Sequence, residues 1–219
     1  MFHPLTMDIT DITALRALYD PVRERSALKE LRQLDAHALR FIALSPLVVL
    51  ATGSAPGEGP QTLDASPRGG EPGFVQTPDA STLLIPDAPG NNRLDTLENI
   101  AGHGAAGAPL GLLFLLPGVD ETLRVNGLAH LSTDADLRRR CADARRVPKL
   151  VIRVQVQASY LHCAKALMRS ALWDAGRQVE RSVLPSLGEM LRDQIGDRLS
   201  ADTPVETQAQ MLERYRQTL

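Results

Sequence analysis

Cysteine is scarce in this chain: only Cys141 and Cys163 occur among 219 residues, and no CxxC motif is present. Two isolated thiols do not supply the disulfide framework of a small secreted domain. The first twenty residues also lack the basic start and the apolar core of a secretory signal peptide. A chain of this length buries roughly 70% of its unfolded surface on folding, so its stability needs no cross-link. We therefore expect a protein of the reducing cytoplasm.

Neither sign of charge is in excess, because 24 Lys and Arg face 26 Asp and Glu, for a formal net charge of −2. Such a balance provides no field to hold a polyanion, and nucleic acid is not expected as a partner. Long hydrophobic runs are missing as well. The longest, near residues 47–52 and 110–117, are far shorter than the roughly 20 residues that span a bilayer. No membrane segment is predicted.

Common catalytic and metal-binding motifs are absent or misplaced. There is no GxSxG, and no two of the five histidines stand four residues apart as in a helical metal site. His162 and Cys163 are adjacent, so their side chains diverge, and neither a metal site nor a catalytic pair is predicted. A literal GxGxxG at residues 102–107 follows a predicted helix and precedes a predicted strand, which reverses the order of the dinucleotide fingerprint. We interpret it as a loop between helix and strand.

Two helices are predicted before residue 46. Apolar residues recur at helical spacing over residues 8–19, and Pro21 ends that pattern. Ser26 can cap a second helix, which carries its apolar residues over 28–42 and ends at Ser45-Pro46.

The chain then changes to the patterns of β-strands. Apolar or alternating runs, separated by turns that contain Gly and Pro, predict six or so short strands broken by helices. This pattern indicates an antiparallel barrel, mainly β with flanking helices. The expected strands are 47–52, 61–66, 73–77, 82–85, 108–116, 122–132 and 150–158, and the expected helices between them are 92–101 and 133–141.

The last part of the chain has no strand pattern. One amphipathic helix is predicted over 184–195 and a weaker one over 205–215. Their apolar faces need a cover, so we expect this tail to lie on the barrel or on a partner subunit. The predicted organisation is therefore N-terminal helices packing on the barrel (1–45), the barrel domain (46–175) and a C-terminal helical extension (176–219).

Two arginines are the first candidates for a binding site. Arg68 follows Ser66-Pro67, and Arg93 follows Gly90-Asn91-Asn92, so each lies beside residues that permit close backbone approach. A guanidinium donates two parallel charge-assisted bonds to a phosphate, and the asparagines can start the next helix, whose N–H groups would face the same anion. The stretch predicts a phosphate-bearing cofactor. The alternative is two solvated loop arginines.

Three further residues have two interpretations each. Arg124 and Asn126 fall on the polar face of the predicted strand 122–132, where they either reach a ligand or are solvated. Trp173, the only tryptophan, either packs within the fold or lies against a flat ligand.

At these residues the sequence resembles the pyridoxamine 5′-phosphate oxidase-like flavoproteins, and in particular their branch of FMN-dependent enzymes without an assigned substrate. The resemblance covers most of residues 8–175, in one order. Its blocks are RFIALSPLVVLAT (40–52), DASPRGGEPGFV (64–75), LLIPDAPGNNRLDTLENI (83–100), GLLFLLPGVDETLRVNGLAHLS (111–132) and YLHCAKALMRSALW (160–173).

The resemblance implies a six-stranded antiparallel split β-barrel that forms a homodimer, with FMN at the subunit interface. It implies that residues 66–68 lie along the flavin, that residues 91–93 hold its phosphate, and that the 160–173 block comes from the other subunit or closes the pocket. The vitamin-binding residues of true pyridoxamine phosphate oxidases are not evident, so that specific reaction is not expected. The implied cofactor-binding residues are Ser66, Pro67, Arg68, Gly69, Asn91, Asn92, Arg93, Arg124, Lys165, Arg169 and Trp173.

The expected function is FMN-dependent oxidoreduction of a small organic substrate, by hydride transfer at the flavin, with NAD(P)H as a candidate electron donor. Lys165 and His162 are the candidates for a catalytic acid or base. A second hypothesis is a flavin-binding carrier or sensor without turnover, which the long helical tail favours. A third keeps the split barrel but replaces the ligand by haem or deazaflavin, with His162 as the candidate axial ligand of haem.

Overall fold

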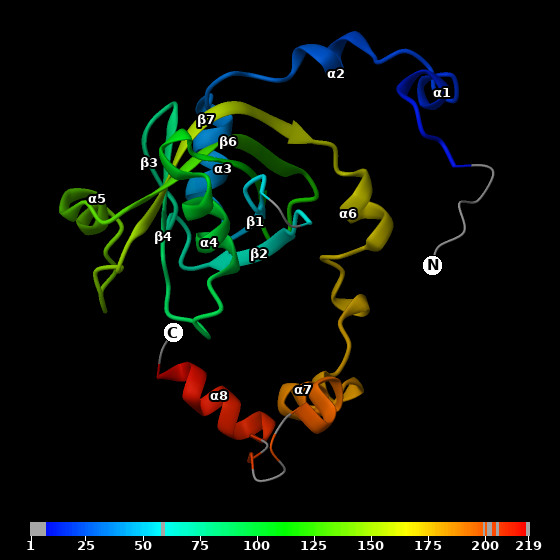
Figure 1. Ribbon diagram of the computed structural model, residues 1–219. Helices are drawn as coiled ribbons and strands as arrows, with labels where there is room; N and C mark the ends of the chain where they lie inside the picture. The colour runs from blue at the N-terminus through cyan, green and yellow to red at the C-terminus, as the bar shows by residue number, and fades with distance from the viewer. Residues whose placement is uncertain (1–7, 58–59, 199, 201–202, 205, 218–219) are drawn as a thin grey trace.

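The computed structural model describes residues 8–57, 60–198, 200, 203–204 and 206–217, and its centre is one antiparallel sheet (Figure 1). Seven strands lie in the order β2-β1-β5-β6-β7-β4-β3, and every neighbouring pair is antiparallel. The strands are β1 (Leu47–Gly53), β2 (Leu63–Gly69), β3 (Gln76–Asp79), β4 (Thr82–Pro86), β5 (Ala108–Leu115), β6 (Thr122–Ser132) and β7 (Val151–His162).

The number of strands is seven, where the resemblance implied six. Each run identified in the sequence contains all or part of one strand, and the predicted bounds of β6 are confirmed. The order of pairing is linear. Within the described residues no pairing joins β2 to β3, so the sheet is open and the predicted barrel is not confirmed. The mixed α and β class is confirmed.

One face of the sheet carries the core and is called the inner face. Val48 and Leu50 of β1 belong to the same buried cluster as Leu83 and Ile85 of β4, although three strands lie between β1 and β4. Phe114 of β5 is fully buried in the same cluster. The sheet therefore curves around one core, and its opposite, outer face points away from that core.

Two helices cover the inner face. Asp35 caps α3 (Ala36–Leu44) by accepting a hydrogen bond from the backbone N–H of Ala38 at 2.8 Å, and Ile42 of this helix enters the core. The second helix, α4 (Asp95–Gly102), buries Leu97 and Ile100 in the same cluster.

The single helix predicted from Ser26 is wrong, because the segment forms two helices. α2 (Glu24–Leu28) has Arg23 rather than Ser26 as its N-cap, and α3 begins anew after Asp35. Between them Leu31 and Ser159 of β7 exchange two backbone hydrogen bonds, at 3.0 and 2.8 Å. Since this bridge uses an extended backbone, the helix cannot continue through it.

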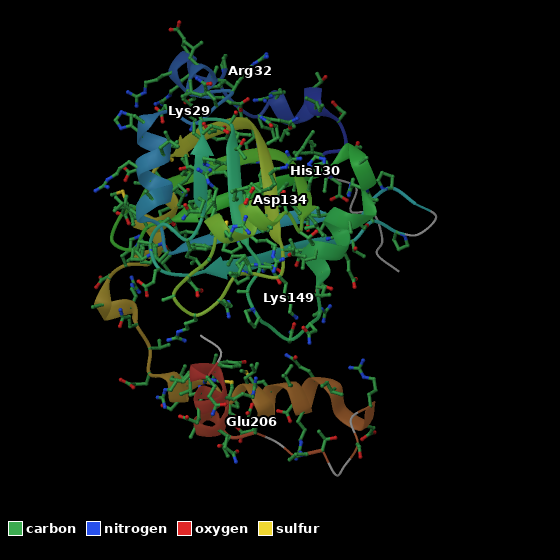
Figure 2. The ribbon with its side chains drawn as sticks, turned by 90° about the vertical axis from the view of Figure 1, so that its left-hand side faces the viewer. Lys29, Arg32, His130, Asp134, Lys149 and Glu206 are labelled. Atoms are coloured by element: carbon green, nitrogen blue, oxygen red, sulfur yellow. The ribbon has the colours of Figure 1, made fainter. Side chains whose placement is uncertain are left out.

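Two arms extend from the body. The N-terminal arm is residues 8–33, with α1 (Ile12–Arg16) and α2, and the C-terminal arm is residues 164–217, with α6 (Lys165–Ser170), α7 (Leu187–Ile195) and α8 (Gln208–Arg216). In Figure 1 the C-terminal arm runs down one side of the sheet to α7 and α8 below it. Figure 2, turned by 90°, likewise places Glu206 below the body. The predicted tail helices agree in position with α7 and α8, except that Val205 lies outside the described residues.

The arms bury almost nothing. Every described residue of the N-terminal arm is exposed, and Met211 is the one buried side chain in the described part of the C-terminal arm. Across the described ranges, no helix combines the length and the apolar character that a membrane crossing requires.

Candidate functional site

A row of side chains crosses five strands on the outer face. The registers place Pro67 of β2 beside Val49 of β1, followed by Leu113 of β5, Arg124 of β6 and Tyr160 of β7. With strands about 4.8 Å apart, Arg124 lies roughly 14 Å from Pro67 along this row. Two of the predicted residues therefore share one face of the sheet, with half-buried apolar side chains between them.

The neighbouring row consists of small side chains. It runs from Ala65 through Ala51 and Gly111 to Asn126 and Ala158. Since no large side chain rises from this row, a flat ring can approach the sheet closely here. Asn126 is the one residue of the row with a polar side chain.

A β-bulge in β7 determines which side chains of this strand lie on the outer face, in these two rows. Gln157 has no partner in β6 at the point where the register shifts. Val156, before the bulge, is buried on the inner face, and Ser159 takes over the buried position after it. Tyr160 and His162 therefore lie on the outer face, because one extra residue reverses the alternation of side chains.

Tyr160 is the centre of a cluster of cations and rings. Its ring centroid lies 5.1 Å from Lys29 Nζ, 5.8 Å from the guanidinium carbon of Arg124, and 5.2 Å from the imidazole centroid of His162. Lys29, which belongs to the N-terminal arm, also donates a hydrogen bond to the carbonyl of Leu161 at 2.8 Å.

The charge of this cluster is not compensated. In the described part of the chain neither Lys29 nor Arg124 forms an ion pair, and Arg124 Nε instead donates to Oδ1 of Asn126 at 3.1 Å. Burial lowers the pKa of His162 from 6.5, and the positive charges of Lys29 and Arg124 lower it further. The imidazole is therefore neutral near pH 7. Two cations that have no acidic partner among the described residues lie against one aromatic ring, and they form a surface suited to a flat ligand that carries negative charge.

The predicted residues of β2 are divided between the two faces. The prediction that Arg68 follows the end of this strand is wrong, because β2 continues to Gly69 and contains Arg68. Ser66 and Arg68 are half-buried on the inner face, whereas Pro67 and Gly69 are exposed on the outer face. Arg68 donates to the carbonyl oxygen of Pro67 at 2.9 Å.

A carboxylate lies close to these inner-face residues. Asp64 accepts hydrogen bonds from the hydroxyl groups of Ser66, at 2.8 Å, and of Thr96 in α4. The second bond attaches the first turn of α4 to β2. The loop that precedes α4 therefore lies beside the predicted residues of β2.

That loop is the expected phosphate site, and its structure differs from the prediction. The N-cap of α4 is Leu94, so neither Asn91 nor Asn92 starts the helix. The side chain of Asn91 instead accepts from the N–H of Arg93 at 3.0 Å. Asn92 and Leu94 have left-handed φ angles of 58° and 59°, a strained backbone for residues other than glycine.

The charge at this helix start opposes an anion. Arg93 is exposed and forms an ion pair with Asp95, from Nε to Oδ2 at 2.6 Å. Asp95 and Glu98 both lie in the first turn of α4. A phosphate that binds here must therefore displace Asp95 from Arg93, or bind Arg93 together with Asp95, close to the negative charges of Asp95 and Glu98. No observation tests the predicted role of residues 91–93, which stays a prediction.

The candidates on the C-terminal arm do not form one cluster. Lys165 and Arg169 are exposed on α6, and the side chain of neither makes a hydrogen bond or ion pair within the described residues. Trp173 donates from its indole N–H to the carbonyl of Val119 at 3.0 Å, so it packs on the turn between β5 and β6 of its own chain.

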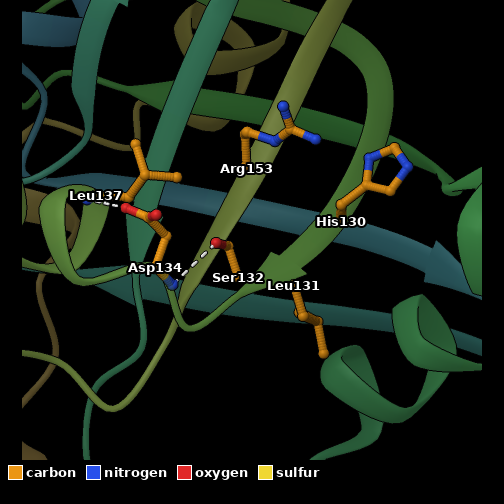
Figure 3. Close-up of a pocket in the computed structure, with 6 residues that line it drawn as sticks. All are labelled: His130, Leu131, Ser132, Asp134, Leu137 and Arg153. Atoms are coloured by element: carbon orange, nitrogen blue, oxygen red, sulfur yellow. Dashed lines mark hydrogen bonds between the residues drawn. The ribbon is translucent and has the colours of Figure 1, made fainter.

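A separate, open hollow of about 470 Å³ lies at the far end of β6 (Figure 3). His130 and Arg153 are cross-strand partners there, and Asp134 caps α5 (Ala135–Arg140) beside them. None of the predicted site residues lines this hollow. In Figure 2 His130 and Lys29 lie apart on the molecule, so the hollow and the Tyr160 cluster are two places.

Two residues of the cluster, Lys29 and Tyr160, were not predicted. The predicted strand 150–158 ended too early to include Tyr160, and the alternation before the bulge would have turned this residue inward. Lys29 lies far away in sequence, and no local pattern indicates that it reaches β7.

The comparison with protein families is decisive for the fold. The family model of pyridoxamine 5′-phosphate oxidase matches residues 34–163, which is more than half of the chain. The chain belongs to this family. The matched range contains all seven strands, α3 and α4, and both arms lie outside it. No curated protein matches the sequence.

Several solved structures are similar in part. HupZ of Group A Streptococcus is 17% identical, with a TM-score of 0.44 over 58% of this chain and 93% of that chain. A Lactobacillus delbrueckii protein, named as a proposed pyridoxamine 5′-phosphate oxidase, is 20% identical, with a TM-score of 0.42 over 61% and 99%. The FAD-binding protein of Mycobacterium smegmatis is 14% identical, with a TM-score of 0.38 over 60% and 100%. These scores are too low to bear on function.

Proposed function

We propose that the protein binds FMN on the outer face of its sheet and acts as an oxidoreductase on a small organic substrate. The observation that carries the proposal is the uncompensated cluster of Lys29, Arg124 and Tyr160 beside a row of small side chains, in a chain of this family. A homodimer with the flavin at the subunit interface, and the family's split-barrel form, are parts of the same proposal.

The residues present fit a flavin mononucleotide. The row from Ala65 to Ala158 gives a flat ring a surface without obstruction. The amide of Asn126 offers donors and an acceptor to the polar edge of that ring. Arg124 and Lys29 supply positive charge within the same face. Arg93 and Arg68 are the candidates for the phosphate. Arg93 must first leave Asp95, and Arg68 lies on the inner face of the edge strand β2, so it can bind only a phosphate that extends past this edge.

Flavin, when bound, supplies hydride exchange with an organic substrate. Arg124 and Lys29 would hold the cofactor and favour negative charge at its ring. His162 is neutral near pH 7 because its pKa is lowered, so its imidazole can accept a proton from a substrate group. Lys165 is the second candidate for proton transfer, and NAD(P)H is the candidate electron donor.

The first test is the visible absorption spectrum of the purified protein, with the mass of any chromophore that it releases. We expect a yellow protein that releases FMN. Titration with FMN and with riboflavin then isolates the role of the phosphate, because the two ligands differ in that group alone. A colourless protein that binds neither ligand would overturn the proposal, and oxidation of NAD(P)H by the FMN-loaded protein tests turnover.

A further inference from the structure

The arms and the outer face expose far more surface than a compact chain of this size does. The accessible surface is 15887 Å² for a mass of 23.8 kDa. A folded monomer of that mass exposes about 9,900 Å² by the usual scaling, so the excess is roughly 6,000 Å². Each partner of an obligate dimer buries roughly 1,000–2,500 Å², and the excess is larger than that.

Much of this surface is apolar and lies on the arms. On the N-terminal arm, Ile12 is 77% exposed and Leu18 65% exposed, and on the C-terminal arm, Val179 is 73% exposed and Val183 64% exposed. An apolar surface of this extent marks an interaction site rather than ordinary solvent contact.

The fold fixes both arms to the same end of β7. The N-terminal arm is attached by the backbone bridge between Leu31 and Ser159 and by the bond from Lys29 to the carbonyl of Leu161. The C-terminal arm follows directly after His162, and Trp173 ties it to the turn between β5 and β6. The arms therefore leave the body from one region, and in Figure 1 they run in different directions around the molecule.

The charge of the arms indicates the kind of partner. The N-terminal arm has five acidic and five basic residues, and residues 164–217 have eight of each. Such arms do not select an anionic membrane or a nucleic acid, because either would need a basic excess. A nearly neutral partner suits them, and this chain, with a net charge of −2, is one.

The outer face provides the matching surface. Leu47 and Val49 of β1 and Leu113 and Leu115 of β5 stand half-buried on it, and within the described residues no helix buries a side chain against these four. A dimer has two such outer faces and four arms. Each arm can cover apolar surface of the partner chain that the partner itself leaves exposed.

We propose that the two arms clasp a second copy of this chain. This inference extends the homodimer of the proposed function to segments outside the family-matched range, and it depends on no ligand. In the dimer, the apolar sides of the arms lie on the partner and complete its hydrophobic surface. Because the arms bury so little in one chain, their substitution leaves the body folded.

The test is the mass of the full chain in solution, measured by light scattering at micromolar concentration with and without FMN. We expect twice 23.8 kDa. The double variant Ile12→Lys with Val179→Lys should raise the dimer dissociation constant by at least tenfold. The matched control, Thr13→Lys with Gln178→Lys, adds the same charges at adjacent exposed positions and should remain dimeric.

Limited digestion with trypsin gives a second measurement, because Arg16 and Arg177 lie on the arms. Cleavage there should be slow in the native protein and in the control, and fast in the Ile12→Lys, Val179→Lys variant. A native protein that is monomeric, or a dimer that the variant leaves as stable as the control, would overturn the clasp. Flavin binding is measured separately. A monomer that binds FMN would overturn the clasp and the interface position of the flavin but not flavin binding, and a dimer that binds no FMN would overturn flavin binding but not the clasp.

Discussion

Arg93 and Asp95 form an ion pair of 2.6 Å at the start of α4, in the loop where the sequence predicts a phosphate site. If Arg93 holds the FMN phosphate, Asp95 competes with that phosphate for the guanidinium. An exposed pair of this kind contributes about 0.2–1 kcal/mol. Asp95→Asn should therefore raise FMN affinity by roughly 1.4-fold to five-fold in a fluorescence titration, and leave riboflavin affinity unchanged. Asp136→Asn, which breaks the exposed pair with Arg139 on α5, is the control. Unchanged FMN affinity would remove Arg93 from the site.

Arg124 is expected to hold the flavin through charge and through its position over Tyr160. Arg124→Gln should weaken FMN binding by about 1–3 kcal/mol, or roughly five- to 150-fold, because a charge-assisted contact is lost. Calorimetry measures the difference. Arg153→Gln changes an exposed arginine of β7 on the same face, opposite His130 of β6, and this variant should bind FMN as the native protein does. Equal losses in the two variants would point to a general effect of surface charge.

His162 should contribute to the loss of stability of the folded protein at acid pH. Its folded-state pKa lies below 6.5, so the unfolded chain takes up a proton at a higher pH than the folded chain does. The stability that neutral His162 contributes to the folded state is complete above pH 6.5. It is lost as the pH falls through 6.5, and the loss stops once the pH lies below the pKa of His162 in the folded state. Thermal unfolding at about pH 7.5 and about pH 5.5 should show a smaller acid loss for His162→Gln than for the native protein. His37→Gln, at an exposed position of α3, serves as the control, and an identical acid loss in both variants would contradict the assignment.

Gly127 of β6 pairs with Val156 of β7, next to the point where the register of the two strands shifts. A Cβ at this position would meet the carbonyl oxygen of Gln155 at 2.3 Å and Cγ1 of Val154 at 2.8 Å. Since one of these atoms belongs to the backbone, Gly127→Ala should reduce the free energy of unfolding by about 1–3 kcal/mol. Gly90→Ala is the control, because no atom lies within 4 Å of its Cβ. Urea unfolding of both variants measures the effect, and equal midpoints would show that the two strands separate at little cost.

The sequence predicts the strands well where alternation is strict. β6 has the predicted bounds because buried and less buried side chains alternate over most of its length, from Leu123 to His130. The helix start at Asp95 was not predicted, since Asn91 uses its side chain for a local turn and Leu94 adopts a left-handed backbone. Helix propensity predicts neither the local turn at Asn91 nor the left-handed backbone of Leu94. The break between α2 and α3 was missed for another reason: it depends on Ser159, far away in the sequence.

The candidate site was predicted in part. Arg124 and Pro67 do share a face, but Arg68 lies on the other side of β2, because the strand extends three residues beyond its predicted end at 66. The role of Lys29 depends on a tertiary contact with Leu161 that no local pattern indicates. The assignments to FMN, to its phosphate and to proton transfer stay predictions.

The bulge at Gln157 has a consequence for how this surface can change. Tyr160 and His162 face outward because β7 holds one residue more than its partner at that point. Loss of that single residue would turn the ring and the imidazole toward the interior and bring Ser159 out, with every residue of the cluster still present. The chemistry of the outer face is therefore encoded in the length of a strand as much as in its composition. Relatives that differ by one insertion or deletion in β7 should have lost or gained this cluster in one step, whereas substitutions alone would need several.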